Sequence, residues 1–170
     1  MNPSDFAAGL VHPLSGADHI LAMVAIGLWG VATGGRAVWA WPAAFIAMVI
    51  VGFAAAIVGL HAPLVEPMIA SSIVVLGLLI ALAVRAPLWL GAVIAGLFAF
   101  FHGHAHGTEA ASTGVGIIAY ASGFSLATAA LHAVGIGGGL ILARSSRESL
   151  MRTTGGFIAL SGLALIAMPA

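Results

Sequence analysis

The chain contains no cysteine and no lysine. Without cysteine it can form neither a disulfide nor a thiolate metal site. Without lysine it can hold no retinal Schiff base and no Walker A loop, so it cannot drive transport with a P-loop ATPase of its own. Charge is scarce as well, because Asp, Glu, Lys and Arg make up only 6% of the 170 residues, whereas about 25% is usual in soluble proteins. The chain therefore lacks the charged surface of a soluble domain.

Long apolar runs take the place of charge, and 62% of the residues are hydrophobic. A membrane-spanning helix needs about 20 mostly apolar residues. We therefore predict an all-α, polytopic integral membrane protein, with one transmembrane domain over residues 1–170 that forms a six-helix bundle. The expected spans are residues 13–33, 38–60, 67–84, 87–105, 114–143 and 150–169. The fifth span is about 45 Å long as a helix, so it must tilt, project from the bilayer or break near residues 135–139.

The arginines predict the orientation in the membrane. All of them lie in or beside the first, third and fifth loops, at Arg36, Arg85, Arg144, Arg147 and Arg152. Positive residues gather on the cytoplasmic side, so we expect both termini to lie outside. All four tryptophans fall near the same inner face, as interfacial anchors would. The first eleven residues, MNPSDFAAGLV, show neither a basic stretch nor a long apolar core, so no secretory signal is visible in them.

Asp18 and His19 stand next to each other within the first predicted span. A membrane-embedded Asp costs about 2.5 to 3.5 kcal/mol at a helix centre and less near the interface, so we expect the pair to be functional. At 1.5 Å per residue from the cytoplasmic ends, Asp18, His19 and His102 lie at a height of about 22 Å and His132 at about 17 Å. We predict that Asp18, His19 and His102 form a central metal site. His132 is then the next position on an inward path.

Further polar residues are expected at the outer surface or just beneath it, where they would collect a cation. This outer set is His12, His61, Glu66, His104, His106 and Glu109. Plainer interpretations exist for each feature. His132 is then an interhelical hydrogen-bond partner, the motif His102-x-His104-x-His106 is an adventitious metal site on an exposed loop, and Asp18–His19 is a structural pair.

The donor types indicate which ion is bound. Imidazole and carboxylate without thiolate suit a divalent first-row metal such as nickel, cobalt or zinc. Such a mixed nitrogen and oxygen site also favours transport, because thiolates would hold the ion too tightly to release it. A membrane potential drives a dication inward with about 4.6 kcal/mol per 100 mV, so no further energy source is required.

Three stretches resemble the motifs of one known family. They are His12-Pro13-x-x-Gly16-x-Asp18-His19-x-x-Ala22-Met23, Phe101-His102-Gly103-His104-Ala105-His106-Gly107 and Ala127-Thr128-Ala129-Ala130-Leu131-His132-Ala133-x-Gly135. These stretches are similar to signatures of the HupE/UreJ family, which is associated with bacterial hydrogenase and urease gene clusters. Its members are regarded as nickel permeases, and some are assigned to cobalt. The resemblance implies six helices and a place in the inner membrane. Many members carry a cleaved leader and a His-rich mature N-terminus, neither of which is visible here.

We therefore expect an inner-membrane permease, not an enzyme, that takes up nickel or, next, cobalt without hydrolysing ATP and supplies maturation of a metalloenzyme such as hydrogenase or urease. Its expected partners are the metal ion, for which zinc is a surrogate, and the lipid bilayer. We expect no nucleic-acid partner and no permanently bound cofactor. The sequence does not decide whether the chain forms a homo-oligomer.

Two other classes remain as alternatives. An intramembrane metal-dependent hydrolase would use a catalytic zinc held by His and Asp, and it would need a spare carboxylate as general base. A haem protein would need axial histidines on opposed helices, which a cluster on one side of the bilayer fits poorly.

Overall fold

The computed structural model describes residues 2–144 and 148–167. Within these ranges the chain is all-helical and contains no strand, which confirms the predicted fold class. The helices are α1 (Pro3–Ser15), α2 (Ala17–Thr33), α3 (Ala37–Ile57), α4 (Val65–Ala81), α5 (Leu88–Thr113), α6 (Ile117–Arg144) and α7 (Glu148–Ala167). Arg147 and the end of the chain at residue 170, which the topology prediction uses, lie outside the described residues.

Apolar helices of membrane-spanning length dominate the described chain. Four of them, α3, α5, α6 and α7, are long and apolar enough to cross a membrane. The helices α1 and α2 pass the same test only as a bent pair, and α4 is a shorter apolar helix of 17 residues. Large apolar side chains are exposed on the outside of the bundle, among them Val93, Leu97, Phe157 and Leu160. The chain is thus a polytopic membrane protein whose outer surface suits lipid.

The first predicted span, residues 13–33, is not one straight helix. The chain breaks at Gly16, which is extended (φ −100°, ψ 120°), and α1 and α2 meet there at 80°. Pro13 was expected at a helix start but lies in the last turn of α1. A proline has no N–H to continue the helical ladder and is tolerated poorly inside a helix, so its place beside a break is understandable.

Two other helices differ from their predicted ranges. α5 continues to Thr113, past the predicted end at residue 105, and stops where Gly114 adopts the left-handed conformation (φ 69°). The second histidine motif is therefore helical throughout. α6 runs unbroken from Ile117 to Arg144, so the glycines at 135–139 do not interrupt it.

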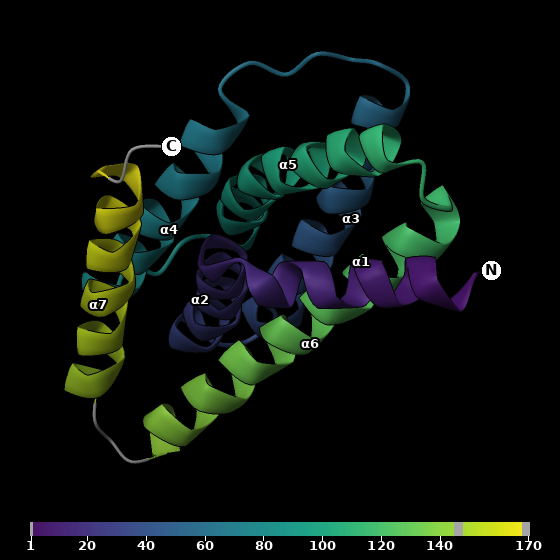
Figure 1. Cartoon of the computed structure of the whole chain (residues 1–170). Helices are drawn as coiled ribbons and strands as arrows, with labels where there is room; N and C mark the ends of the chain where they lie inside the picture. Colours follow the sequence, from purple (N-terminus) through teal and green to yellow (C-terminus); the bar gives the residue numbers. More distant parts are fainter. Residues whose placement is uncertain (1, 145–147, 168–170) are drawn as a thin grey trace.

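The helices pack as close pairs around a central α2. α3 lies along α5, α4 lies along α7, and α1 and α2 both lie against α6 (Figure 1). Glycines allow these approaches, since a Cβ at Gly103 would collide with the carbonyl of Val49 and one at Gly27 with the carbonyl of His132. α2 also contacts α3, α4 and α7. The first turn of α2, which carries Asp18 and His19, is therefore close to several other helices.

Two of the four tryptophans are buried. The indoles of Trp29 and Trp41 have no exposed surface, and their ring centroids lie 4.1 Å apart. Their N–H groups donate to backbone carbonyls within residues 84–88, at 2.9 and 3.0 Å, which satisfies the polar atom of each indole in the core. Trp39 and Trp89 are each 69% exposed. The prediction of four interfacial anchors is therefore wrong for Trp29 and Trp41.

Candidate metal centre

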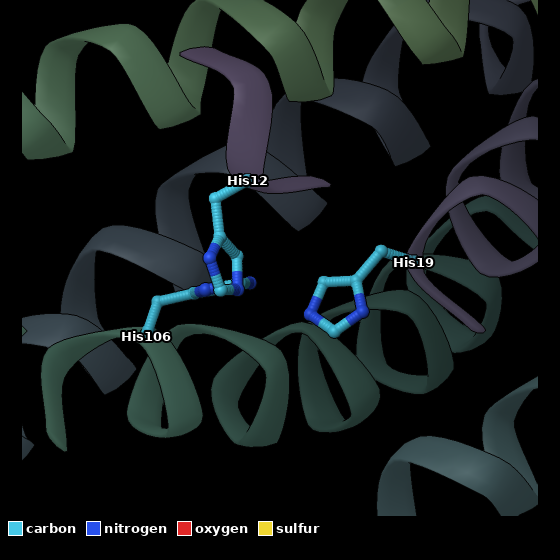
Figure 2. A group of neighbouring side chains, drawn as sticks. All are labelled: His12, His19 and His106. Atoms are coloured by element: carbon cyan, nitrogen blue, oxygen red, sulfur yellow. The ribbon is translucent and has the colours of Figure 1, made fainter. Parts of the chain in front are cut away.

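Three helices each bring one imidazole to the same place. His12 of α1, His19 of α2 and His106 of α5 each offer a ring nitrogen within 4.8 Å of the other two. Figure 2 shows the three rings converging, with ring centroids of His106 4.6 Å from those of both His12 and His19. Metal–imidazole bonds are about 2.0–2.1 Å long, so nitrogens on one ion lie about 3 to 4 Å apart. The nitrogens of these three residues, which we call the histidine cluster, are therefore close to the spacing that one ion requires.

The bend at Gly16 brings two residues of this cluster, His12 and His19, close together. In a straight helix His12 and His19 would be about 10.5 Å apart along the axis, but the bend brings their ring centroids to 6.1 Å. Gly16 also lies against the Asp18–His19 pair, because a Cβ at this position would be 2.6 Å from Asp18 Oδ1 and 3.0 Å from His19 Nδ1. A larger residue would displace the pair, so the glycine is part of the construction of the site.

Asp18 is bound to His19. Its Oδ1 accepts the backbone N–H of His19 at 2.8 Å and lies 2.7 Å from the ring Nδ1. A carboxylate only accepts, so Nδ1–H donates to it and Nε2 keeps its lone pair. That Nε2 is buried and has no hydrogen-bond partner among the described residues. Asp18 thus has the geometry of a residue that orients a metal ligand, and its role as a direct ligand stays a prediction.

His106 is buried without any hydrogen-bond partner. It is 1% exposed, and neither ring nitrogen is paired within the part of the chain that the structure describes. Its ring packs against Phe124, with centroids 4.0 Å apart. Roughly 90% or more of buried polar groups are paired, and each unpaired one costs about 1–3 kcal/mol. A bound cation would supply the partner that this imidazole lacks.

The cluster opens into a pocket of about 360 Å³. We call it the histidine pocket; its lining includes His12, His19 and His106 together with Glu66 and Glu109. Glu109 Oε2 lies 3.1 Å from His12 Nε2. Carboxylates attract a dication electrostatically and supply oxygen ligands. Glu66 and Glu109, both predicted in the outer set, are therefore brought to the same place as the imidazoles.

His102 lies next to the cluster, as predicted. Its ring centroid is 5.1 Å from that of His19, and the side chain is fully buried. Ser72 Oγ donates to the carbonyl of Ile69 at 2.6 Å, so at 3.2 Å it accepts from His102 Nε2–H. The other ring nitrogen, Nδ1, then carries the lone pair and has no partner among the described residues. Nδ1 of His102 is thus a buried acceptor, and the role of His102 as a metal ligand stays a prediction.

Two residues of the predicted outer set lie away from the pocket. His104 is buried, and its Nε2–H donates to the carbonyl of Leu60 at 2.7 Å, so it ties down the segment after α3. His61 is exposed in the segment between α3 and α4 and is not part of the pocket lining. His106 is buried and lines the pocket, which agrees with a place just beneath the surface. Helical spacing explains the difference, because positions 102 and 106 share one face of α5 while 104 faces elsewhere.

His132 lies on α6 and is 2% exposed. Within the described ranges neither of its ring nitrogens has a hydrogen-bond partner, and the same holds for Oγ1 of Thr128, one turn earlier on the same helix. Thr128 is fully buried. We call these two residues the inner station. The sequence predicted His132 as a separate position on the path, and the structure places it outside the histidine pocket.

Comparisons with known proteins point to one family. A family model with the description HupE / UreJ protein matches residues 1–165, which include every histidine discussed above. The chain is also similar to the curated Protein HupE of Rhizobium leguminosarum bv. viciae, with 43% identity over 159 residues, 94% of this chain and 83% of that protein. No solved structure matches.

Proposed function

The chain belongs to the HupE/UreJ family, and from this premise we propose that it is a permease of the bacterial inner membrane for a divalent first-row metal. Nickel is the first candidate and cobalt the second, and the imported ion supplies maturation of a metalloenzyme such as hydrogenase or urease. One observation supports this most directly: imidazoles from three helices converge, and the buried nitrogens of His19 and His106 have no partner among the described residues.

The ion follows the polar side chains. Glu66 and Glu109 attract it into the histidine pocket, and the histidine cluster binds it while Asp18 holds the ring of His19. His102 and then His132 receive it on the way inward. Because each step exchanges one nitrogen ligand for another, the ion stays partly coordinated in the apolar interior. A site without thiolates holds nickel or cobalt less tightly, which allows release.

The direction of uptake requires a particular topology. We propose six spans, in which the bent pair α1–α2 and the short α4 each count as one, with both termini and the histidine pocket outside. Since the chain has no cysteine, single cysteines can report the orientation. An impermeant thiol reagent should label Ser4→Cys in intact cells and Ser149→Cys only after lysis. The opposite labelling pattern would overturn the proposed orientation.

Uptake into proteoliposomes tests the function itself. With an inside-negative potential, the wild-type protein should admit nickel to an entrapped fluorescent chelator, and His19→Ala and His106→Ala should abolish the signal. His61→Ala is the matched control, because His61 is exposed and lies outside the histidine pocket. Absence of uptake by the wild type contradicts a permease. Full uptake by both cluster variants contradicts the assignment of the site.

The hydrolase alternative is not favoured. It needs a carboxylate that is free to act as general base beside the ligands. Asp18 is engaged with His19, and Glu109 Oε2 lies 3.1 Å from His12 Nε2, which leaves Glu66 of the pocket lining as the candidate base. Family membership favours metal handling over hydrolysis.

A further inference from the structure

A phenyl ring contacts two of the buried imidazoles. Successive ring centroids are 4.6 Å apart from His106 to His19 and 5.1 Å apart from His19 to His102. The next ring is that of Phe45, 5.7 Å from His102 and 5.0 Å from His132. The ring of Phe45 thus contacts both imidazoles, and its edge-on arrangement with His132 has an interplanar angle of 84°.

Phe45 is held firmly in this position. It lies on α3, which packs against both α5, the helix of His102, and α6, the helix of His132. The side chain has no exposed surface. A buried ring in a close-packed interior leaves no opening for water or a hydrated ion beside it. His102 and His132 therefore share a buried apolar neighbour.

The polar atoms of the inner station lack hydrogen-bond partners among the described residues, and a bound ion would supply one. The nitrogens of His132 and Oγ1 of Thr128 are buried and unpaired within the described part of the chain. Such atoms rarely remain unpaired in a folded protein. Phe45 contacts His132 directly and contacts His102, the neighbour of His19, so its ring is next to polar side chains of both groups.

We propose that Phe45 is the barrier of the permeation path, which separates an outer metal site at the histidine cluster and His102 from a second metal site at His132 and Thr128. The proposal rests on the proposed permease function. An apolar constriction blocks hydrated ions by excluding water. An ion passes when the ring moves aside and imidazole ligands on the two sides replace its water. Mg²⁺, which gives up water reluctantly, is excluded.

Replacing Phe45 by alanine should open the path. In proteoliposomes that contain Phe45→Ala, nickel entry should rise about tenfold, the change that lowering the barrier by about 1.4 kcal/mol produces. Mg²⁺, which the wild type excludes, should now enter as well. Nickel affinity of the purified protein, measured by titration, should stay within about twofold, because all ligands of the outer site remain. Phe45→Leu, which keeps an apolar side chain of similar size, should give a smaller change in the same direction.

Phe53→Leu is the matched control, since Phe53 is a buried phenylalanine two turns further along α3 whose ring stacks on Tyr120. It should leave both entry rates unchanged. Unchanged or slower nickel entry in Phe45→Ala and Phe45→Leu, with nickel affinity retained, overturns the barrier. If the wild type and both variants bind nickel but pass no metal, the barrier and the permease both fail. If the wild-type protein binds no nickel, the outer site is refuted, whatever the Phe45 variants do.

Discussion

Two pockets of nearly equal volume lie at opposite ends of α2 and α4. The histidine pocket, of about 360 Å³, lies at the first turns of these helices. A second pocket, of about 350 Å³, lies at their last turns, between the end of α6 and the start of α7. Its polar lining comes from Arg85, Glu148 and Arg152, and the rest is mostly apolar. We call it the arginine pocket.

The difference between the pockets lies in donor atoms, not in space. Imidazole and carboxylate carry lone pairs that bind a cation, whereas guanidinium carries only N–H donors and a permanent positive charge. Arg152 Nε donates to the carbonyl of Ala81 at 2.9 Å, which fixes its head group at the end of α4. Two arginines against one glutamate leave the arginine pocket with a net positive charge, whereas the carboxylates and imidazoles of the histidine pocket attract a dication. In a permease this asymmetry favours capture at the histidine pocket and release at the arginine pocket.

Removing an imidazole from the histidine pocket should have the largest effect on nickel affinity. His106→Ala deletes a ligand whose nitrogens are both buried and unpaired among the described residues. Nickel affinity should fall by more than about 100-fold, beyond the 10–100-fold that loss of an outer-shell partner gives. Titration of the purified protein with nickel measures the loss. The counterpart in the other pocket, Arg152→Ala, should bind nickel like the wild type; equal losses in the two variants would show that the pockets do not differ as described.

Asp18→Asn tests the contribution of the carboxylate charge, because it removes the charge and keeps the shape of the side chain. The amide no longer holds Nδ1–H of His19 as a carboxylate does, so the ring loses its orientation. We expect nickel affinity to fall about 10–100-fold, the usual effect of an outer-shell partner. Asp5→Asn is the control, because Asp5 lies at the far end of α1, where it accepts the N–H of Gly116. An affinity in Asp18→Asn as low as in His106→Ala would indicate that Asp18 is a direct ligand.

Much of this asymmetry was predictable from the sequence. Apolar runs predicted the helices, and estimates of depth correctly brought His19 near His102, whose rings lie 5.1 Å apart. His106 was assigned with His12 to the outer set, and its place beside His19 was missed because α5 was expected to end at residue 105. The i, i+4 spacing of His102 and His106 is a signal that would have found it, since on a longer helix both residues share one face.

The bend was beyond sequence reasoning. A glycine in an apolar helical segment is usually tolerated without a break. The glycines within residues 135–139 are an example, because α6 continues through them. At Gly16 the chain bends because tertiary contacts decide: α1 packs along α6, while α2 lies at the centre of the bundle. Local sequence does not encode those contacts. His12 therefore could not be placed beside His19 from sequence alone.

Gly16→Ala tests whether the bend serves the histidine pocket. The new Cβ would meet Asp18 Oδ1 at 2.6 Å and His19 Nδ1 at 3.0 Å, so the pair must shift. We expect about a tenfold loss of nickel affinity, at the lower end of outer-shell effects, because all ligands remain present. Gly137→Ala is the matched control, as a Cβ there meets nothing within 4 Å. If both alanine variants bind nickel equally well, Gly16 has no special part in the site.

The smallest effect should come from the arginine pocket. Arg85 is exposed, so solvent and salt screen its repulsion of a dication over about 10 Å. Arg85→Gln removes that repulsion and should speed passage from the arginine pocket outward by about twofold, with no change in nickel affinity. Efflux from nickel-loaded proteoliposomes, in which protein orientation has been determined, measures this rate. The effect should shrink at high ionic strength because it is electrostatic. An efflux rate that is unaltered at low ionic strength would mean that the charge of the arginine pocket has no influence on the direction of transport.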